Sequence, residues 1–131
     1  MMWKILVVDD NERNVELIVE TLEGIAKCQT AKNGEEALTA YNTAITGQNA
    51  FDVALLDVAM PGIDGIDVLK AIRAKEEERG IPFGEGMPII MVTANKEPFI
   101  KAYRTGCDDY ILKPIDPEKL ITMIEEKLSN K

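Results

Sequence analysis

The sequence predicts one α/β domain in which five parallel strands alternate with five helices, a doubly wound (βα)5 fold. Short runs of apolar, strand-forming residues alternate with longer segments whose apolar residues recur at helical spacing. The length of 131 residues fits one hydrophobic core. The content of 46% hydrophobic and 29% charged residues is typical of a globular domain. We therefore expect residues 1–131 to form one domain.

Five short apolar runs are the predicted strands. The first reads Trp-Lys-Ile-Leu-Val-Val, and the third ends directly at Asp57. The second run is more polar, as expected for a strand at the edge of a sheet. The strands are expected at residues 3–8, 26–31, 51–56, 88–93 and 110–112.

The segments between the strands carry helix signals. Gly24 and Gly106 lie near expected helix ends, and Asp116 followed by Pro117 is typical of a helix start. Helices are expected at 14–25, from the Asn33-Gly34 turn to 45, from Asp64-Gly65 onward, at 96–105, and from 117 to 128 with Leu120, Ile124 and Leu128 on one face. The charged run 75–79 is expected to be a solvated helix end. Phe99 and Tyr103 are four residues apart and are expected to pack inward.

The segment 80–87 contains three glycines and a proline, but it is too short to separate two cores. No second core is apparent, so any output module is expected outside this chain. The net charge of −8 disfavours direct binding to nucleic acid, which relies on clustered Lys and Arg. The longest apolar stretch, 87–92, is too short to cross a bilayer, and the first residues lack a signal-peptide cleavage region. A cytoplasmic location with no membrane contact is expected, with Cys28 and Cys107 as reduced thiols.

A chain of this class is expected to take the strand order 2-1-3-4-5, with a cleft beyond the carboxyl ends of the first and third strands. That order is a general rule for the fold class and does not follow from these residues alone. The cleft would then collect the polar side chains that follow the strands: Asp9, Asp10, Asp57, Thr93 and Lys113.

Three carboxylates in one cleft repel one another unless a cation lies between them. Because all the ligands are oxygen atoms, a hard cation is expected, and Mg²⁺ suits a site that also binds phosphate. An aspartate can itself be the nucleophile in phosphoryl transfer when metal and lysine neutralise the charge. Asp57 is the best candidate for this role. Lys113 would supply a positive charge, and Thr93 could donate a hydrogen bond to a phosphoryl oxygen.

Four motifs occur in order along the chain: Val-Val-Asp-Asp at 7–10, Asp-Val-Ala-Met-Pro-Gly-Ile-Asp-Gly at 57–65, Val-Thr-Ala at 92–94 and Leu-Lys-Pro at 112–114. This pattern resembles the response regulator receiver family of two-component signalling, over essentially the whole chain. The resemblance implies a flavodoxin-like fold and a phosphoacceptor signalling domain that is not a conventional enzyme. It also implies a cis bond between Lys113 and Pro114, which the sequence alone does not establish.

The resemblance assigns roles to individual residues. It implies that Asp57 accepts phosphate and that Mg²⁺ is bound by Asp10, Asp57 and the carbonyl of Ala59, with Asp9 acting through water. Lys113 and Thr93 would then bind the phosphoryl group.

A switch is also implied by the resemblance. On phosphorylation, Thr93 would move toward the phosphate and Tyr110 would turn inward. These movements would remodel the face that the fourth helix, the fifth strand and the fifth helix form. The expected phosphodonor is a sensor histidine kinase or a histidine phosphotransfer protein. The target is an output protein or domain, and a homodimer that forms on phosphorylation is left open.

Simpler interpretations compete with these roles. Asp9 and Asp10 could merely start a helix, and Tyr110 could be a static aromatic residue. A metal-dependent phosphohydrolase similar to the haloacid dehalogenases would carry Asp-x-Asp on its first strand, which this chain lacks. A flavin mononucleotide binder would need a Ser/Thr/Gly-rich phosphate loop where two aspartates stand. A receiver that works without phosphorylation is disfavoured by the complete acidic set.

Overall fold

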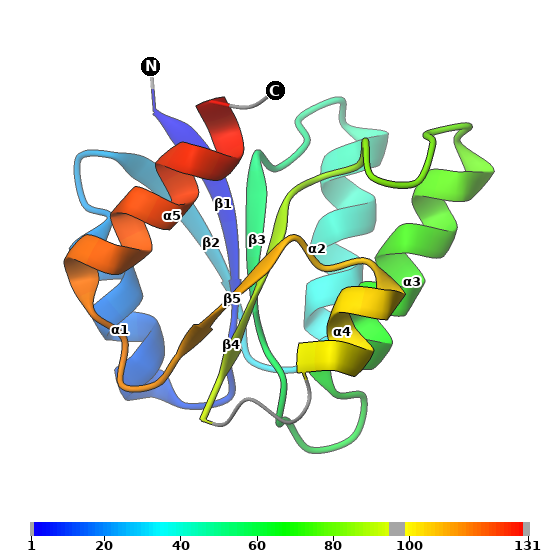
Figure 1. Ribbon diagram of the computed structural model, residues 1–131. Coiled ribbons are helices and arrows are strands. Elements are labelled where there is room, and N and C mark those ends of the chain that lie inside the picture. Colours follow the sequence, from blue (N-terminus) through cyan, green and yellow to red (C-terminus); the bar gives the residue numbers. More distant parts are fainter. Residues whose placement is uncertain (1, 95–98, 130–131) are drawn as a thin grey trace.

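The computed structural model of the protein describes residues 2–94 and 99–129. Within them, five strands form one parallel sheet in the order β2-β1-β3-β4-β5 (Figure 1). The strands are β1 (Trp3–Val8), β2 (Ala26–Ala31), β3 (Val53–Asp57), β4 (Ile89–Thr93) and β5 (Asp109–Leu112). The predicted fold class and strand order are confirmed, and the polar second strand lies at an edge of the sheet as expected.

The helices cover both faces of the sheet. They are α1 (Glu12–Thr21), α2 (Gly34–Thr46), α3 (Gly65–Glu78), α4 (Phe99–Thr105) and α5 (Pro117–Ser129). Figure 1 shows α1 and α5 on one face and α2, α3 and α4 on the other. The start of the helix predicted from residue 96 lies outside the described residues. None of the helices in the described ranges is long and apolar enough to cross a membrane.

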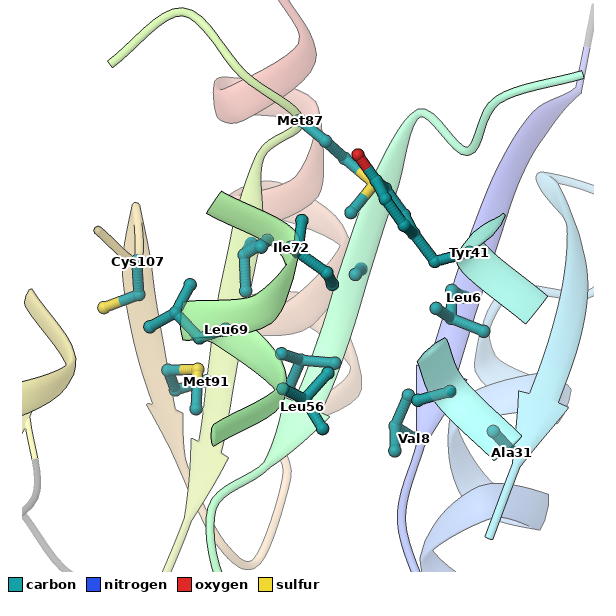
Figure 2. Packing of buried hydrophobic residues seen from close by; sticks show 14 of the residues in the cluster. Leu6, Val8, Ala31, Tyr41, Leu56, Leu69, Ile72, Met87, Met91 and Cys107 are labelled. Atoms are coloured by element: carbon teal, nitrogen blue, oxygen red, sulfur yellow. The ribbon is translucent and has the colours of Figure 1, made fainter. Parts of the chain in front are cut away.

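Alternation along the strands divides the apolar residues between two cores, because successive strand side chains point to opposite faces. Leu6, Leu56 and Met91 pack toward α2, α3 and α4 (Figure 2). Ile5, Leu55 and Val92 pack toward α1 and α5. The predicted row on the last helix is confirmed, with Leu120 and Ile124 fully buried and Leu128 packed against the same core.

Helix α1 begins at Glu12 rather than at residue 14 and ends at Thr21 rather than at 25. The side chain of Asn11 accepts hydrogen bonds from the N–H groups of Arg13 and Asn14 and so caps the helix start. At the other end, Gly24 adopts a positive φ of 81° in the turn that leads to β2. The difference reflects capping and turn geometry, which apolar spacing does not register.

Two expectations about exposure are wrong. The charged run 75–79 is not uniformly solvated, because Glu76 is only 5% exposed and its carboxylate binds Arg73. Tyr103 does not pack inward and is 61% exposed, whereas the side chain of Phe99 lies outside the described residues. Met87, at the end of the segment 80–87, is buried in the core beneath α2 and α3.

Candidate functional site

The carboxyl ends of β1, β3, β4 and β5 lie along one edge of the sheet. Val8 pairs with Leu56, Asp57 with Val92, and Thr93 with Leu112, so the ends of the strands are level. This register brings together the side chains that follow or end these strands, as the sequence predicts. Asp9, Asp10, Asp57 and Lys113 form one cluster at this edge.

Carboxylate oxygens of Asp9, Asp10 and Asp57 all lie within 4.8 Å of one another. Asp9 and Asp57 are buried at 1% and 3% exposure, whereas Asp10 is exposed. The ammonium of Lys113 lies 3.3 Å from Oδ1 of Asp57 and 3.4 Å from Oδ2 of Asp9. One cation therefore stands between two buried carboxylates.

The pKa of Asp57 is raised from 3.8 to about 6, mainly because the carboxyl is buried and secondly because of the negative charge of Asp9. The positive charge and hydrogen bond of Lys113 lower the pKa but do not cancel these effects. The carboxyl is consequently less acidic than an exposed aspartate, yet it is mostly ionised at neutral pH. A perturbed carboxyl at a sheet edge is a common mark of a functional site.

The two carboxylate oxygens of Asp9 differ in their hydrogen bonding. Its Oδ1 accepts a hydrogen bond from the N–H of Asn11 at 2.9 Å. Its Oδ2 is buried and has no hydrogen-bond partner within the part of the chain that the structure describes, although the Lys113 ammonium is close enough for an ion pair. Buried oxygens without donors are costly. A hard cation held by oxygen ligands would satisfy this atom, so the donor set fits Mg²⁺.

Backbone contacts hold the segment after Asp57 in place. The N–H of Gly65, the first residue of α3, donates to the carbonyl of Val58 at 2.9 Å. A side chain at residue 65 would overlap the carbonyl oxygen of Asp57, so only glycine allows α3 to begin this close to the site. The N–H of Lys113 donates to the carbonyl of Thr93 at 2.8 Å, and the bond between Lys113 and Pro114 is cis.

The other predicted residues lie on β4, on β5 and in the loop after β3. Thr93 is the buried last residue of β4. Tyr110 on β5 is half-buried against the core beneath α2, α3 and α4. Ala59 lies exposed in the loop that follows β3. The sequence analysis did not single out Asn11, which caps α1 directly after the acidic pair. The preference of asparagine for helix starts is the signal that could have indicated this cap.

Comparison with known proteins decides the family. Residues 5–125 match the family described as the response regulator receiver domain. The chain belongs to this family. Its geometry agrees with that membership, because the acidic cluster is the kind of site through which receiver domains bind Mg²⁺.

Relatives of this receiver domain include a sensor histidine kinase and a DNA-binding response regulator. The chain is 38% identical over 124 residues to the sensor histidine kinase GacS of Pseudomonas protegens, covering 92% of this chain and 13% of that kinase. It is 33% identical over 131 residues to the DNA-binding response regulator MtrA of Mycobacterium tuberculosis, covering 98% of this chain and 51% of MtrA. The receiver domain therefore spans about half, or much less, of these curated relatives.

Solved structures match the receiver domain at its full length. The chemotaxis protein CheY4 of Vibrio cholerae superposes with a TM-score of 0.81 at 29% identity, covering 96% of this chain and 98% of that one. A CheY-like receiver domain protein of Methanospirillum hungatei gives a TM-score of 0.80 at 28% identity, covering 99% and 96%. This receiver domain thus has the architecture of a signalling domain shared by histidine kinases and response regulators.

Proposed function

We propose that this receiver domain accepts a phosphoryl group on Asp57 from a phosphohistidine of a sensor histidine kinase or a histidine phosphotransfer protein. The observation that best supports the proposal is the Lys113 ammonium, 3.3 Å from a buried Asp57 carboxylate that two further aspartates flank. This combination supplies a nucleophile and a fixed positive charge for an incoming phosphoryl group.

In the proposed transfer, an ionised carboxylate oxygen of Asp57 attacks phosphorus. The new O–P bond forms as the P–N bond to the donor histidine breaks, and the imidazole nitrogen keeps the bonding electron pair. The pKa of Asp57 is raised to about 6, by burial first and by the charge of Asp9 second, so the ionised, attacking form predominates at pH 7. The product is an acyl phosphate whose added negative charge needs compensation.

We infer that Asp10, Asp57 and the carbonyl of Ala59 would hold Mg²⁺, with Asp9 contributing through a water molecule. When bound, the metal neutralises part of the phosphoryl charge. Lys113, which already lies beside Asp57 and Asp9, would bind a phosphoryl oxygen as a point charge. The Thr93 hydroxyl would donate to another.

The acyl phosphate would act as a signal that the domain itself removes by hydrolysis. We propose that Thr93 moves toward the phosphoryl group, that Tyr110 turns inward, and that the face of α4, β5 and α5 is remodelled for an output partner. Reversing a 1:99 equilibrium needs roughly 5.5 kcal/mol of differential stabilisation, which charge-assisted bonds to the phosphoryl group could supply. We further propose that residues 1–131 act as one receiver domain.

Intact mass after incubation with Mg²⁺ and acetyl phosphate or phosphoramidate tests the acceptor. We expect one phosphoryl adduct on the wild-type chain and none on Asp57→Asn. The control is Asp52→Asn, an exposed aspartate just before the same strand, which should retain the adduct. An adduct on Asp57→Asn would identify another acceptor. Absence of any adduct on the wild type, together with no binding of a beryllofluoride mimic, would contradict phosphorylation.

A further inference from the structure

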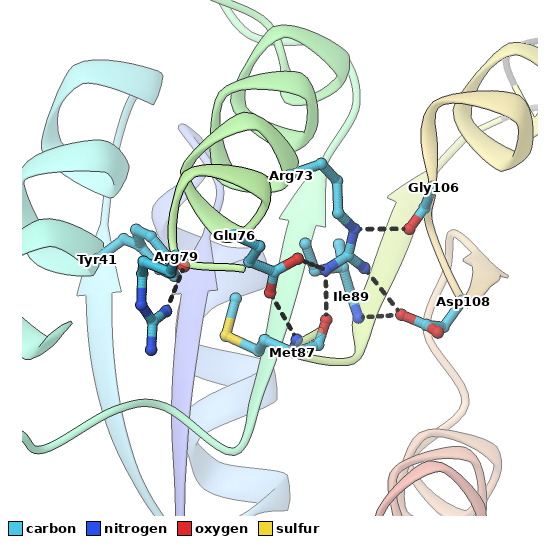
Figure 3. A network of polar contacts seen from close by, with 8 residues as sticks. All are labelled: Tyr41, Arg73, Glu76, Arg79, Met87, Ile89, Gly106 and Asp108. Carbon is cyan, nitrogen blue, oxygen red and sulfur yellow. Dashed lines mark hydrogen bonds and ion pairs between the residues drawn. The ribbon is translucent and has the colours of Figure 1, made fainter. Parts of the chain in front are cut away.

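Arg73, on the inner side of α3, joins three separate segments of the chain (Figure 3). Its Nε donates to the carbonyl of Gly106 at 2.9 Å, just after α4. Its Nη1 donates to Glu76 at 2.7 Å and to the carbonyl of Met87 at 2.8 Å, and its Nη2 donates to Asp108 at 3.1 Å. One guanidinium thus links α3 to the entry of β4, the end of α4 and the entry of β5.

Glu76 balances the charge of Arg73 and secures the same junction. Its second carboxylate oxygen accepts a hydrogen bond from the N–H of Met87 at 2.7 Å. A side chain at Gly86 would overlap this carboxylate, so the loop before β4 is shaped around it. The side chains of Arg73 and Glu76 are only 15% and 6% exposed, and such a pair has few alternative partners.

The segment that follows α4 is held by the same group of contacts. Gly106 ends the helix with φ at 121°, and its N–H and that of Cys107 both return to the carbonyl of Ala102. The carboxylate of Asp108 accepts from the N–H of Ile89 at 2.8 Å, while the N–H of Asp108 donates to the carbonyl of the same residue at 2.8 Å. The carboxyl end of α4 is therefore fixed on β4 and α3.

This anchor lies far from the acidic cluster. Ile89 is the first residue of β4, whereas Thr93 ends that strand at the edge where the carboxylates gather. Two large apolar side chains, Ile100 and Tyr103, project from α4 at 64% and 61% exposure. Their orientation depends on how the helix is held at the anchored end.

We propose that Arg73 is a positioning residue that fixes the carboxyl end of α4 and thereby sets the orientation of this helix on the domain. Any displacement of α4 would then pivot about Gly106. The pivot rests on the proposed function, since α4 belongs to the face that phosphorylation is proposed to remodel. The anchor itself does not depend on phosphorylation.

Amide hydrogen exchange in the unliganded protein tests the anchor. Arg73→Lys keeps the charge beside Glu76 but loses the planar fork that reaches Gly106 and Asp108 together. We expect the amides of Gly106 and Cys107 to exchange roughly tenfold faster in this variant, beyond any increase at the central Leu55 amide of β3. Lys70→Gln, an exposed change on the same helix, should alter neither.

Two results would overturn the proposal. If all three amides accelerate by the same factor, Arg73 contributes only to overall stability. If Arg73→Lys exchanges like the wild type, a positive charge suffices and the fork does not position α4.

A second experiment separates this inference from the proposed function. Addition of Mg²⁺ and beryllofluoride to the wild type should shift the amide resonances of Ile100 and Tyr103 but leave Gly106 nearly unchanged. In Arg73→Lys we expect the shift to extend to Gly106. A wild-type protein that does not respond to beryllofluoride would contradict the proposed function and leave the exchange result on the anchor intact. A large shift at Gly106 in the responding wild type would contradict the pivot.

Discussion

The Nζ atom of Lys113 lies 3.3 Å from Oδ1 of Asp57, and the same atom lies 3.4 Å from Asp9. A single ammonium is thus shared between two buried carboxylates, with the exposed Asp10 beside them. Two negative charges that share one positive charge leave the cluster under-compensated. Its properties should therefore change strongly with pH, with the loss of either partner, and with added cations.

Asp57→Asn is expected to stabilise the metal-free protein at neutral pH. The pKa of Asp57 is about 6 in the folded chain against an ordinary 3.8, so the folded state binds more protons between these values. Stability contributed by this group is complete below pH 3.8 and is lost as pH rises through about 6. The loss by pH 7 is on the order of 2–3 kcal/mol. Urea unfolding in a chelator at pH 7.5 should show the variant more stable by part of this amount.

The control is the same comparison of unfolding free energies at pH 4, which tests whether ionisation of Asp57 causes the predicted difference in stability. Because the wild-type carboxyl is then largely protonated, the advantage of Asp57→Asn should shrink toward zero. An advantage of equal size at both pH values would mean that packing, not ionisation, separates the two proteins.

Lys113→Met is expected to move the pKa of Asp57 above about 6, because the charge and hydrogen bond of Lys113 lower it in the wild type. Carbon-13 resonances of the Asp57 carboxyl, followed across pH, report this value directly. Lys127→Met removes a lysine from the surface pair with Asp109 and should leave the Asp57 titration unchanged. An unaltered midpoint in Lys113→Met would show that the 3.3 Å contact is not maintained in solution.

Much of the fold could be predicted because local patterns and topology agree in this chain. Strand 3–8 and the polar edge strand 26–31 have the predicted bounds, since apolar runs and turn signals delimit them. The cluster of Asp9, Asp57 and Lys113 could also be predicted, because these residues end or follow parallel strands whose carboxyl ends lie at one edge of the sheet.

Features that depend on contacts between distant segments could not be predicted. Arg73 and Glu76 belong to a charged helix, and nothing in their spacing indicates that loop 80–87 and the end of α4 close over them. Likewise, exposure of Tyr103 depends on how α4 is rotated against the sheet, which helical periodicity alone does not define.

Glu76→Gln and Glu77→Gln form a matched pair on neighbouring residues of α3. The first removes a buried charge that faces Arg73 and the N–H of Met87, and it should reduce the free energy of unfolding by about 2 kcal/mol. Glu77→Gln alters an exposed side chain and should change the free energy of unfolding by about 0.5 kcal/mol or less. Thermal or urea unfolding measures both, and equal effects would refute a specific role for the buried carboxylate.

Gly65→Ala is expected to destabilise the protein by about 1–3 kcal/mol, because the new methyl group would overlap the carbonyl oxygen of Asp57. Relief of that overlap must move either α3 or the Asp57 backbone, so the resonances of Asp57 and Val58 should also shift. Gly47→Ala, at a negative φ of −81°, gives a milder contact and a smaller cost. If the two changes are equally tolerated in unfolding measurements, α3 does not begin as close to the site as described.

Mg²⁺ is expected to stabilise the receiver domain by binding the folded state alone. A metal concentration ten times the Kd should add about 1.4 kcal/mol to the free energy of unfolding. Asp10→Asn removes an exposed carboxylate of the cluster and should abolish most of this gain, whereas Asp52→Asn should retain it. Thermal unfolding across a magnesium titration, repeated with matched concentrations of NaCl to separate screening from binding, measures the effect. Equal stabilisation of wild type and Asp10→Asn would show that magnesium acts elsewhere, because ionic screening of surface charge does not depend on one carboxylate.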